Sequence, residues 1–215
     1  DDVEARAAVF AAAEYEGPAY LRFGRLAVPR INDADNYNFE IGKMFPKVLK
    51  DIVDAQDKEG AIPDTVPHIY GTKPADPVCS SFLVLAKKAY EFTGNKELLE
   101  KVYKNLCAWE NCLLGLSKDY IVEHSNYGDW ASPAYACIKG SLGDGAKSIK
   151  VPGAFMSTGY FYYNALLLSE FAGILGKKED NEKYKSLAEN IKKAILEKWF
   201  DENTAKVCGG EMSCQ

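Results

Sequence analysis

Hydrophobic residues recur at helical spacing through most of the chain beyond residue 40. In the clearest stretch, 96–116, they fall at alternating three- and four-residue steps: Leu99, Val102, Leu106, Trp109, Leu113 and Leu116. This spacing places all six on one face of a helix. The stretch 181–200 repeats the pattern with Tyr184, Leu187, Ile191, Ile195 and Trp199. The pattern predicts helices at 41–56, 80–92, 96–116, 157–175 and 181–200.

Two pairs of these helices are joined by very short links, at 93–95 and 176–180. Each link contains a glycine, Gly94 or Gly176, where a helix end needs a left-handed residue. Short links predict antiparallel helical hairpins. Between the pairs, 119–154 is rich in Gly, Ser and Pro with interspersed aromatic residues. This segment is too long for a simple connection and is a candidate functional loop.

The first forty residues have a different character. An Ala-rich stretch from Val3 to Tyr15 favours a helix, and Ala19 to Gly24 alternates in the manner of a strand. The polar cluster at 32–36 then predicts a turn. A boundary between two parts of the chain is therefore expected near residues 30–43.

Ordered motifs run from residue 38 to the end of the chain. They are Asn38-Phe39-Glu40, residues 48–56, residues 60–67, Asp76-Pro77-Val78, residues 90–95, Tyr127-Gly128-Asp129-Trp130, residues 157–160 and Cys214-Gln215. In this order they resemble the catalytic domain of α-L-rhamnosidases, and agreement over several loops is more specific than any single motif. The resemblance covers 44–215 and implies a mainly α fold in which helical hairpins form part of an (α/α)6 toroid. It also implies inverting cleavage of terminal α-L-rhamnose.

Residues 1–43 resemble a different family. Residues 6–9 and 14–25, with 36–43, are similar to a transketolase segment at the end of its pyrimidine-binding domain. This segment is too short to hold thiamine diphosphate, so the resemblance transfers no catalytic residue and no cofactor. The two resemblances imply a natural fusion, a misassembled sequence or an engineered chimera, and the sequence leaves these alternatives open.

Four residues are candidates for substrate binding: Asp129, Trp130, Asp76 and Asp64. A Trp face can stack on the apolar side of a sugar while a neighbouring carboxylate accepts hydrogen bonds from hydroxyl groups. The alternative for Asp129 and Trp130 is a turn residue followed by a core aromatic residue. For Asp64 and Asp76, which lie beside prolines, the alternative is turn stabilisation alone.

The resemblance implies no complete catalytic pair in this chain. An inverting glycosidase needs a carboxylic acid and a carboxylate base about 6.5–9.5 Å apart. The family's acid motif lies upstream of the position that matches Asn38, and its base motif lies beyond the position that matches Gln215. Neither motif is present, so the catalytic residues are unknown and the chain is expected to be an inactive part of the enzyme. Cys79 matches a position where the family commonly has a sugar-facing Trp, which implies a lost stacking surface.

Composition excludes several classes of function. The chain has 215 residues, 47% hydrophobic, and a net charge of −5 with scattered basic residues, so a nucleic-acid partner is not expected. No apolar run is long enough to span a membrane, and no cofactor is predicted. His68 and His124 lack further ligands at metal spacing. The six cysteines lack C-x-x-C spacing, which predicts buried free thiols and favours a cytoplasmic location without establishing one.

Two alternatives to a rhamnosidase-type glycosidase remain. One is a non-catalytic carbohydrate-binding or helical interaction module, favoured by the missing acid and base motifs and by Cys79. The other is a transketolase-related protein, which would need a thiamine site. The expected partner is a rhamnose-containing carbohydrate. Five helices cannot close a ring of six hairpins, so apolar helix faces are expected to be exposed and to promote self-association.

Overall fold

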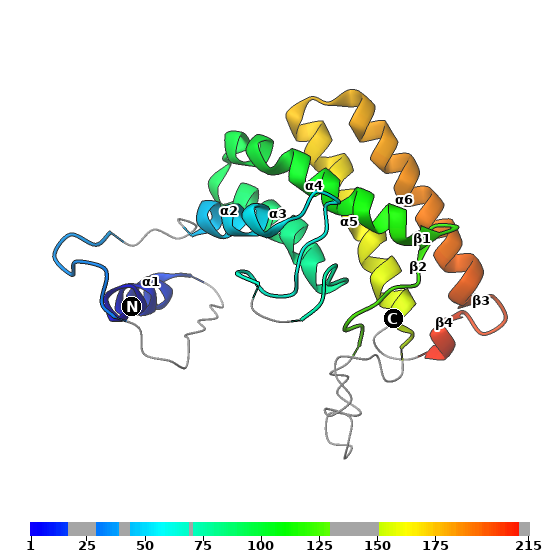
Figure 1. Ribbon diagram of the computed structural model, residues 1–215, viewed down its shortest axis with the longest axis horizontal. Coiled ribbons are helices and arrows are strands. Elements are labelled where there is room, and N and C mark those ends of the chain that lie inside the picture. Colours follow the sequence, from blue (N-terminus) through cyan, green and yellow to red (C-terminus); the bar gives the residue numbers. More distant parts are fainter. Residues whose placement is uncertain (17–28, 39–43, 69–70, 130–150, 211–215) are drawn as a thin grey trace, which may run out of the picture. The chain divides into compact units, whose positions relative to one another are not determined.

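The computed structural model describes residues 1–16, 29–38, 44–68, 71–129 and 151–210 (Figure 1). The chain divides into two compact units, 1–47 and 48–215. The helix α2 (Phe45–Ala55) crosses this division.

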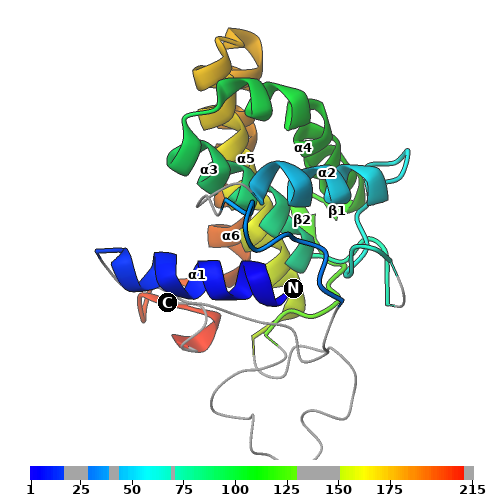
Figure 2. The same ribbon diagram turned by 90° about the vertical axis from the view of Figure 1, so that its left-hand side faces the viewer.

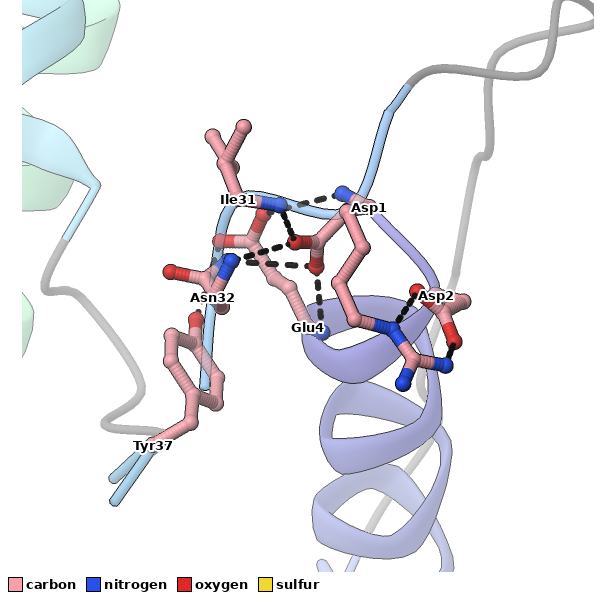
Figure 3. Close-up of polar contacts among 7 residues, drawn as sticks. Asp1, Asp2, Glu4, Ile31, Asn32 and Tyr37 are labelled. Atoms are coloured by element: carbon pink, nitrogen blue, oxygen red, sulfur yellow. Dashed lines mark hydrogen bonds and ion pairs between the residues drawn. The ribbon is translucent and has the colours of Figure 1, made fainter. Parts of the chain in front are cut away.

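The first unit is built on helix α1 (Asp2–Glu14), which confirms the helix predicted there. Asp1 caps it, because its carboxylate accepts a hydrogen bond from the Glu4 backbone N–H at 3.1 Å. The same carboxylate accepts from the backbone N–H groups of Ile31 and Asn32 at 2.6 and 2.7 Å (Figure 3). One aspartate thus ties the segment after residue 29 to the start of the helix. The strand predicted at 19–24 lies outside the described residues.

The second unit contains the two predicted hairpins. Helix α3 (Ser81–Thr93) leads through Gly94 into α4 (Lys96–Leu116), and α5 (Gly153–Leu175) leads through Gly176 into α6 (Lys178–Trp199). The two glycines have φ angles of +61° and +75°, the left-handed conformation expected at these helix ends. In both views α5 and α6 run antiparallel, side by side (Figures 1 and 2). Helices α3 and α4 both contact α5, so the hairpins pack together.

The end of α2 is anchored to α4 by an amide pair. The side chain of Gln56 donates to the Asn105 carbonyl oxygen at 3.0 Å and accepts from the Asn105 side-chain amide at 2.8 Å. Beyond it, Gly60 has a φ of +86° and lies so close to α4 that a Cβ there would stand 2.2 Å from the Ala108 carbonyl oxygen. Glycine is therefore required where the chain turns away from α2.

The core of the second unit lies between the hairpins. Its largest fully buried side chains are Trp109, Tyr184, Phe82, Phe161, Phe171, Leu49, Ile62, Leu83, Leu106, Leu113, Leu167 and Leu168. Polar groups are buried among them: Ser80 accepts hydrogen bonds from the Trp109 indole at 3.2 Å and from the Asn164 amide at 2.9 Å. Glu110 lies beside Asn164 and is 0% exposed. Burial raises the pKa of Glu110 well above its ordinary value.

Short elements complete the described chain. Helix α4 continues into an antiparallel ribbon of β1 (Ser117–Lys118) and β2 (Ile121–Val122), and the Val122 N–H donates to the Thr158 hydroxyl of α5 at 3.0 Å. A second ribbon, β3 (Phe200–Asp201) with β4 (Lys206–Val207), follows α6. The remaining elements are the 3-10 turns η1 (Val78–Ser80) and η2 (Cys208–Gly210). Within the described residues, no helix is both long enough and apolar enough to cross a membrane.

The helix bounds differ in places from the sequence prediction. Helix α5 begins at Gly153 rather than 157, since Pro152 precedes it and glycine and alanine open its first turn. Helix α2 begins at Phe45, after a turn at Met44, and the predicted start at 41 lies outside the described residues. Cys79, Cys107 and Cys112 are free thiols as predicted, but only Cys79 is buried, and Cys107, Cys112 and Cys208 are half-buried. Cys137 and Cys214 lie outside the described residues.

Candidate functional site

Two buried turns form the base of the candidate site. The Ala75 N–H donates to the Ile62 carbonyl oxygen at 3.1 Å, which holds the turn before η1 against the segment that carries Pro63 and Asp64. The Cys79 thiol donates to the Pro63 carbonyl oxygen at 3.1 Å. Burial raises the pKa of Cys79 to about 12, and Asp64 and Asp76 add to this effect electrostatically. Both carboxylates therefore lie within electrostatic range of one neutral thiol.

The segment 124–127, just after β2, joins these two turns. The His124 ring contacts the Asp76 carboxylate through Nδ1, and the Asn126 N–H donates to the Asp76 carbonyl oxygen at 3.0 Å. The Tyr127 hydroxyl donates to Asp64 Oδ2 at 2.5 Å. Two side chains and one backbone group of this segment thus connect parts of the sequence that are about fifty to sixty residues apart.

The two aspartates differ in their surroundings. Asp76 is 0% exposed, whereas Asp64 is half-buried. Each has a second oxygen, Oδ1 of Asp64 and Oδ2 of Asp76, that is buried and accepts no hydrogen bond within the described residues. Gly71 packs directly on Asp64: with φ at +103°, a Cβ there would stand 1.9 Å from Oδ2. The neighbours of both carboxylates therefore fix the positions of their oxygens.

The structure brings together part of the set predicted from sequence. Asp64 and Asp76 meet through the 124–127 segment, and Asp129 is half-buried two residues beyond Tyr127, with interactions of its own. Trp130 lies outside the described residues. Cys79 occupies the buried interior, where its thiol bonds the loop that carries Asp64.

Sequence reasoning missed His124. It was considered only as a metal ligand, and the described residues contain no group of three or more His, Cys, Asp or Glu side chains arranged to hold a metal ion. Its place three residues before Tyr127, in the same loop as the Gly128-Asp129 motif, was the signal that could have identified it. The side chain of His124 is 40% exposed, so it is the accessible member of the pair with Asp76.

A separate hollow of about 470 Å³ lies between the end of α2 and the segment 63–68. Its described lining is Asp51, Asp54, Ala55, Pro63, Val66, Pro67, His68 and Lys73. Lys73 forms an ion pair with Asp57 at 3.0 Å. Burial alone would raise the pKa of Asp57, but Lys73 and the Ala61 N–H outweigh it and lower the pKa overall. The hollow shares Pro63 with the loop of the candidate site, but Asp64, Asp76 and His124 are not part of its lining.

Comparison with known proteins identifies the family. A family profile described as the bacterial alpha-L-rhamnosidase six-hairpin glycosidase domain matches residues 27–214. The chain belongs to this family. The match confirms the predicted α-L-rhamnosidase resemblance and the fold class of hairpins forming part of an (α/α)6 toroid. It begins within the segment 1–43 for which a transketolase resemblance was predicted, and that second resemblance stays a prediction.

Individual α-L-rhamnosidases agree with this assignment. The chain is 26% identical over 171 residues to an alpha-L-rhamnosidase of Formosa agariphila, an alignment that covers 79% of this chain and 18% of the relative. Its fold is similar to the alpha-L-rhamnosidase from Dictyoglumus thermophilum, with a TM-score of 0.67, 32% identity, and coverage of 77% of this chain and 18% of that one.

The Streptomyces avermitilis alpha-L-rhamnosidase complexed with L-rhamnose also shares the fold, with a TM-score of 0.60 and 23% identity. That similarity covers 78% of this chain and 16% of the other. The chain thus spans less than a fifth of the length of the rhamnosidases it matches.

Proposed function

We propose that this chain forms part of the sugar-binding wall of an α-L-rhamnosidase-type glycosidase, which cleaves terminal α-L-rhamnose with inversion. The observation that carries the proposal is the connection of Asp64 and Asp76 by the segment 124–127. Fixed acceptor oxygens of this kind suit the hydroxyl groups of a neutral sugar. Family membership supports rhamnose as the sugar, because the relatives are α-L-rhamnosidases.

The roles proposed for the four candidate residues now differ. Asp64 is half-buried, and it is proposed to accept from a sugar hydroxyl through Oδ2, the oxygen that also accepts from Tyr127, because its Oδ1 is buried. Asp129 and Trp130 are proposed as a further hydrogen-bonding and stacking element, on the basis of the family resemblance alone. Asp76 is fully buried and is proposed to act through the residues it holds rather than by touching the sugar.

The proposal assigns no acid or base to the described residues. Among the described residues, the one carboxyl with a strongly raised pKa is Glu110, and such a shift is often a sign of a general acid. Glu110 is instead enclosed between α4 and α5 with no exposed surface, so no glycosidic oxygen can reach it. An inverting reaction needs two carboxyl groups facing the sugar from opposite sides. We propose that the parts of the relatives outside the matched region supply both.

The test combines binding and turnover in one preparation. L-rhamnose is titrated into the purified chain by calorimetry, and release of chromophore from an aryl α-L-rhamnoside is followed in parallel. We expect weak binding with a Kd on the order of 1 mM, which corresponds to about −4 kcal/mol, and no turnover. Turnover would show that carboxyl groups within this chain supply acid and base.

A matched pair of variants makes the binding result specific. Asp64→Asn should weaken L-rhamnose binding, whereas Asp51→Asn, a change of the same kind on the exposed face of α2, should not. Absence of L-rhamnose binding by the wild-type chain would contradict the proposal and favour the helical interaction module. If a longer protein of the length typical of the family binds L-rhamnose but does not cleave the aryl α-L-rhamnoside, the non-catalytic carbohydrate-binding module would be favoured.

A further inference from the structure

The side chains of the His124–Asp76 pair differ in their exposure to solvent. Asp76 is 0% exposed and one of its oxygens contacts His124 Nδ1, while the His124 side chain is 40% exposed. A buried carboxylate beneath a partly exposed imidazole fixes the orientation of the ring from below. The ring edge that carries Nε2 is therefore the part of the pair that a ligand can reach.

The chemistry of the contact determines what Nε2 presents. An ionised carboxylate has only acceptor sites, so Nδ1 must carry the proton in its contact with Asp76. In a neutral imidazole the other nitrogen is then unprotonated and accepts hydrogen bonds. His124 Nε2 has no hydrogen-bond partner in the part of the chain that the structure describes. The pair thus leaves one oriented acceptor available.

The surroundings of this acceptor match those of a sugar site. The Asn126 N–H bonds the Asp76 carbonyl oxygen, and the Tyr127 hydroxyl bonds Asp64, so the His124 backbone is anchored on the same base as the Asp64 carboxylate. Carboxylate and imidazole acceptors together are complementary to hydroxyl donors of a neutral sugar.

We propose that His124 is a sugar-binding residue that accepts a hydrogen bond from a hydroxyl group of the bound deoxyhexose through Nε2, and that Asp76 is a positioning residue that selects the required tautomer. This inference rests on the proposed sugar-binding function and assigns to the site a residue beyond the four predicted from sequence. The exposed ring of His124 then contributes to specificity, and the buried carboxylate of Asp76 sets the orientation of that ring.

The first test observes the ring directly. The chain contains only two histidines, His68 and His124, so ¹⁵N-histidine labelling gives two sets of ring signals, which a His68→Gln variant assigns. In the free chain at pH 8, His124 should show the Nδ1-protonated tautomer. Addition of L-rhamnose should shift its Nε2 signal and leave both ring signals of His68 unchanged. A His124 ring protonated at Nε2 in the free chain would overturn the inference.

The second test measures affinity. His124→Phe keeps an aromatic side chain but replaces the imidazole and so removes both nitrogens, and it should weaken L-rhamnose binding roughly 5- to 10-fold, the effect of one net hydrogen bond to the sugar. His124→Gln, which can present an amide oxygen near the position of Nε2, should restore part of the loss, and His68→Gln should bind as the wild type does. Circular dichroism and thermal unfolding establish that each variant is folded.

The outcomes separate this inference from the function on which it rests. If the wild-type chain binds L-rhamnose but His124→Phe binds equally well and the His124 signals do not move, the inference is wrong and the proposed function stands. If the wild-type chain does not bind L-rhamnose, both are wrong. Loss of affinity in His124→Phe with partial recovery in His124→Gln supports both.

Discussion

Replacement of Glu110 by Gln should stabilise the chain at neutral pH. Glu110 lies between α4 and α5 at 0% exposure, and burial raises its pKa well above 4.5. A proton on this carboxyl supplies a donor beside Asn164, whose Oδ1 accepts no hydrogen bond within the described residues. The folded state therefore holds a proton that the unfolded state releases as the pH rises above 4.5.

Proton linkage gives the sign and size of the expected change in the free energy of unfolding. The stabilising contribution of the protonated carboxyl is fully present below the unfolded pKa and is lost as the pH rises toward the folded pKa, at about 1.4 kcal/mol per pH unit. Over the interval from pH 4.5 to 7 the loss is at most about 3.5 kcal/mol. A Gln side chain does not titrate, so the variant loses no stability at this position as the pH rises. Its additional amide hydrogen lacks an acceptor, however, which costs about 1 kcal/mol. The net gain expected for Glu110→Gln at pH 7 is therefore at most about 2.5 kcal/mol.

Urea denaturation at pH 5 and pH 7 tests this expectation. The free energy of unfolding should fall between the two pH values in the wild-type chain and fall less in Glu110→Gln. The control is Glu97→Gln on the same helix: Glu97 is exposed and the ion pair with Lys101 lowers its pKa, so this variant should keep the wild-type pH dependence. Equal pH slopes in the wild type and Glu110→Gln would refute the claim that the fold keeps this carboxyl protonated.

Four further predictions concern the site and the surface. Gly71→Ala should destabilise the chain by about 1–3 kcal/mol in thermal unfolding, because its Cβ would meet the Asp64 carboxylate at a φ of +103°; Gly115→Ala, which meets nothing within 4 Å, should not. Tyr127→Phe should weaken L-rhamnose binding several-fold in calorimetry, because Asp64 loses its 2.5 Å hydrogen bond. Cys79, buried and with a pKa of about 12, should react with iodoacetamide at pH 8 far more slowly in the folded chain than in urea, as mass spectrometry would show. Light scattering should show concentration-dependent self-association, because α5 exposes apolar groups at Tyr160, Tyr163 and Leu166, and a single monomeric peak at high concentration would count against this.

Helix periodicity predicted most of the fold. The stretch 96–116 was bounded correctly at both ends, since Asn95 caps the helix by accepting from the Leu98 N–H at 2.9 Å and a ribbon follows it at Ser117. The start of α5 was placed four residues late, because Gly153 and Ala154 carry no apolar periodicity and the stability of this first turn depends on its surroundings. The very short strands β1 and β2 could not be predicted, since two-residue strands have no pattern of their own.

The site was only partly predictable for a similar reason. Asp64 and Asp76 were selected because they lie beside prolines in loops that match the family, but no spacing in the sequence indicates that one is buried and the other accessible. His124 was missed because its significance depends on Asp76, a residue 48 positions away. Pairwise contacts across loops are set by the packing of α3, α4 and α5, which a local pattern does not reveal.

The 63-residue separation of Asp64 and Tyr127 has a consequence for the order of folding. Closing a flexible loop of that length costs roughly 4 kcal/mol of chain entropy, more than the 1 kcal/mol or so that one hydrogen bond returns. The contact can therefore form only after α3 and α4, which lie between the two residues, have paired and brought them together. The sugar site is then a late product of folding. Substitutions that destabilise the α3–α4 hairpin should therefore reduce ligand binding before they unfold the rest of the chain.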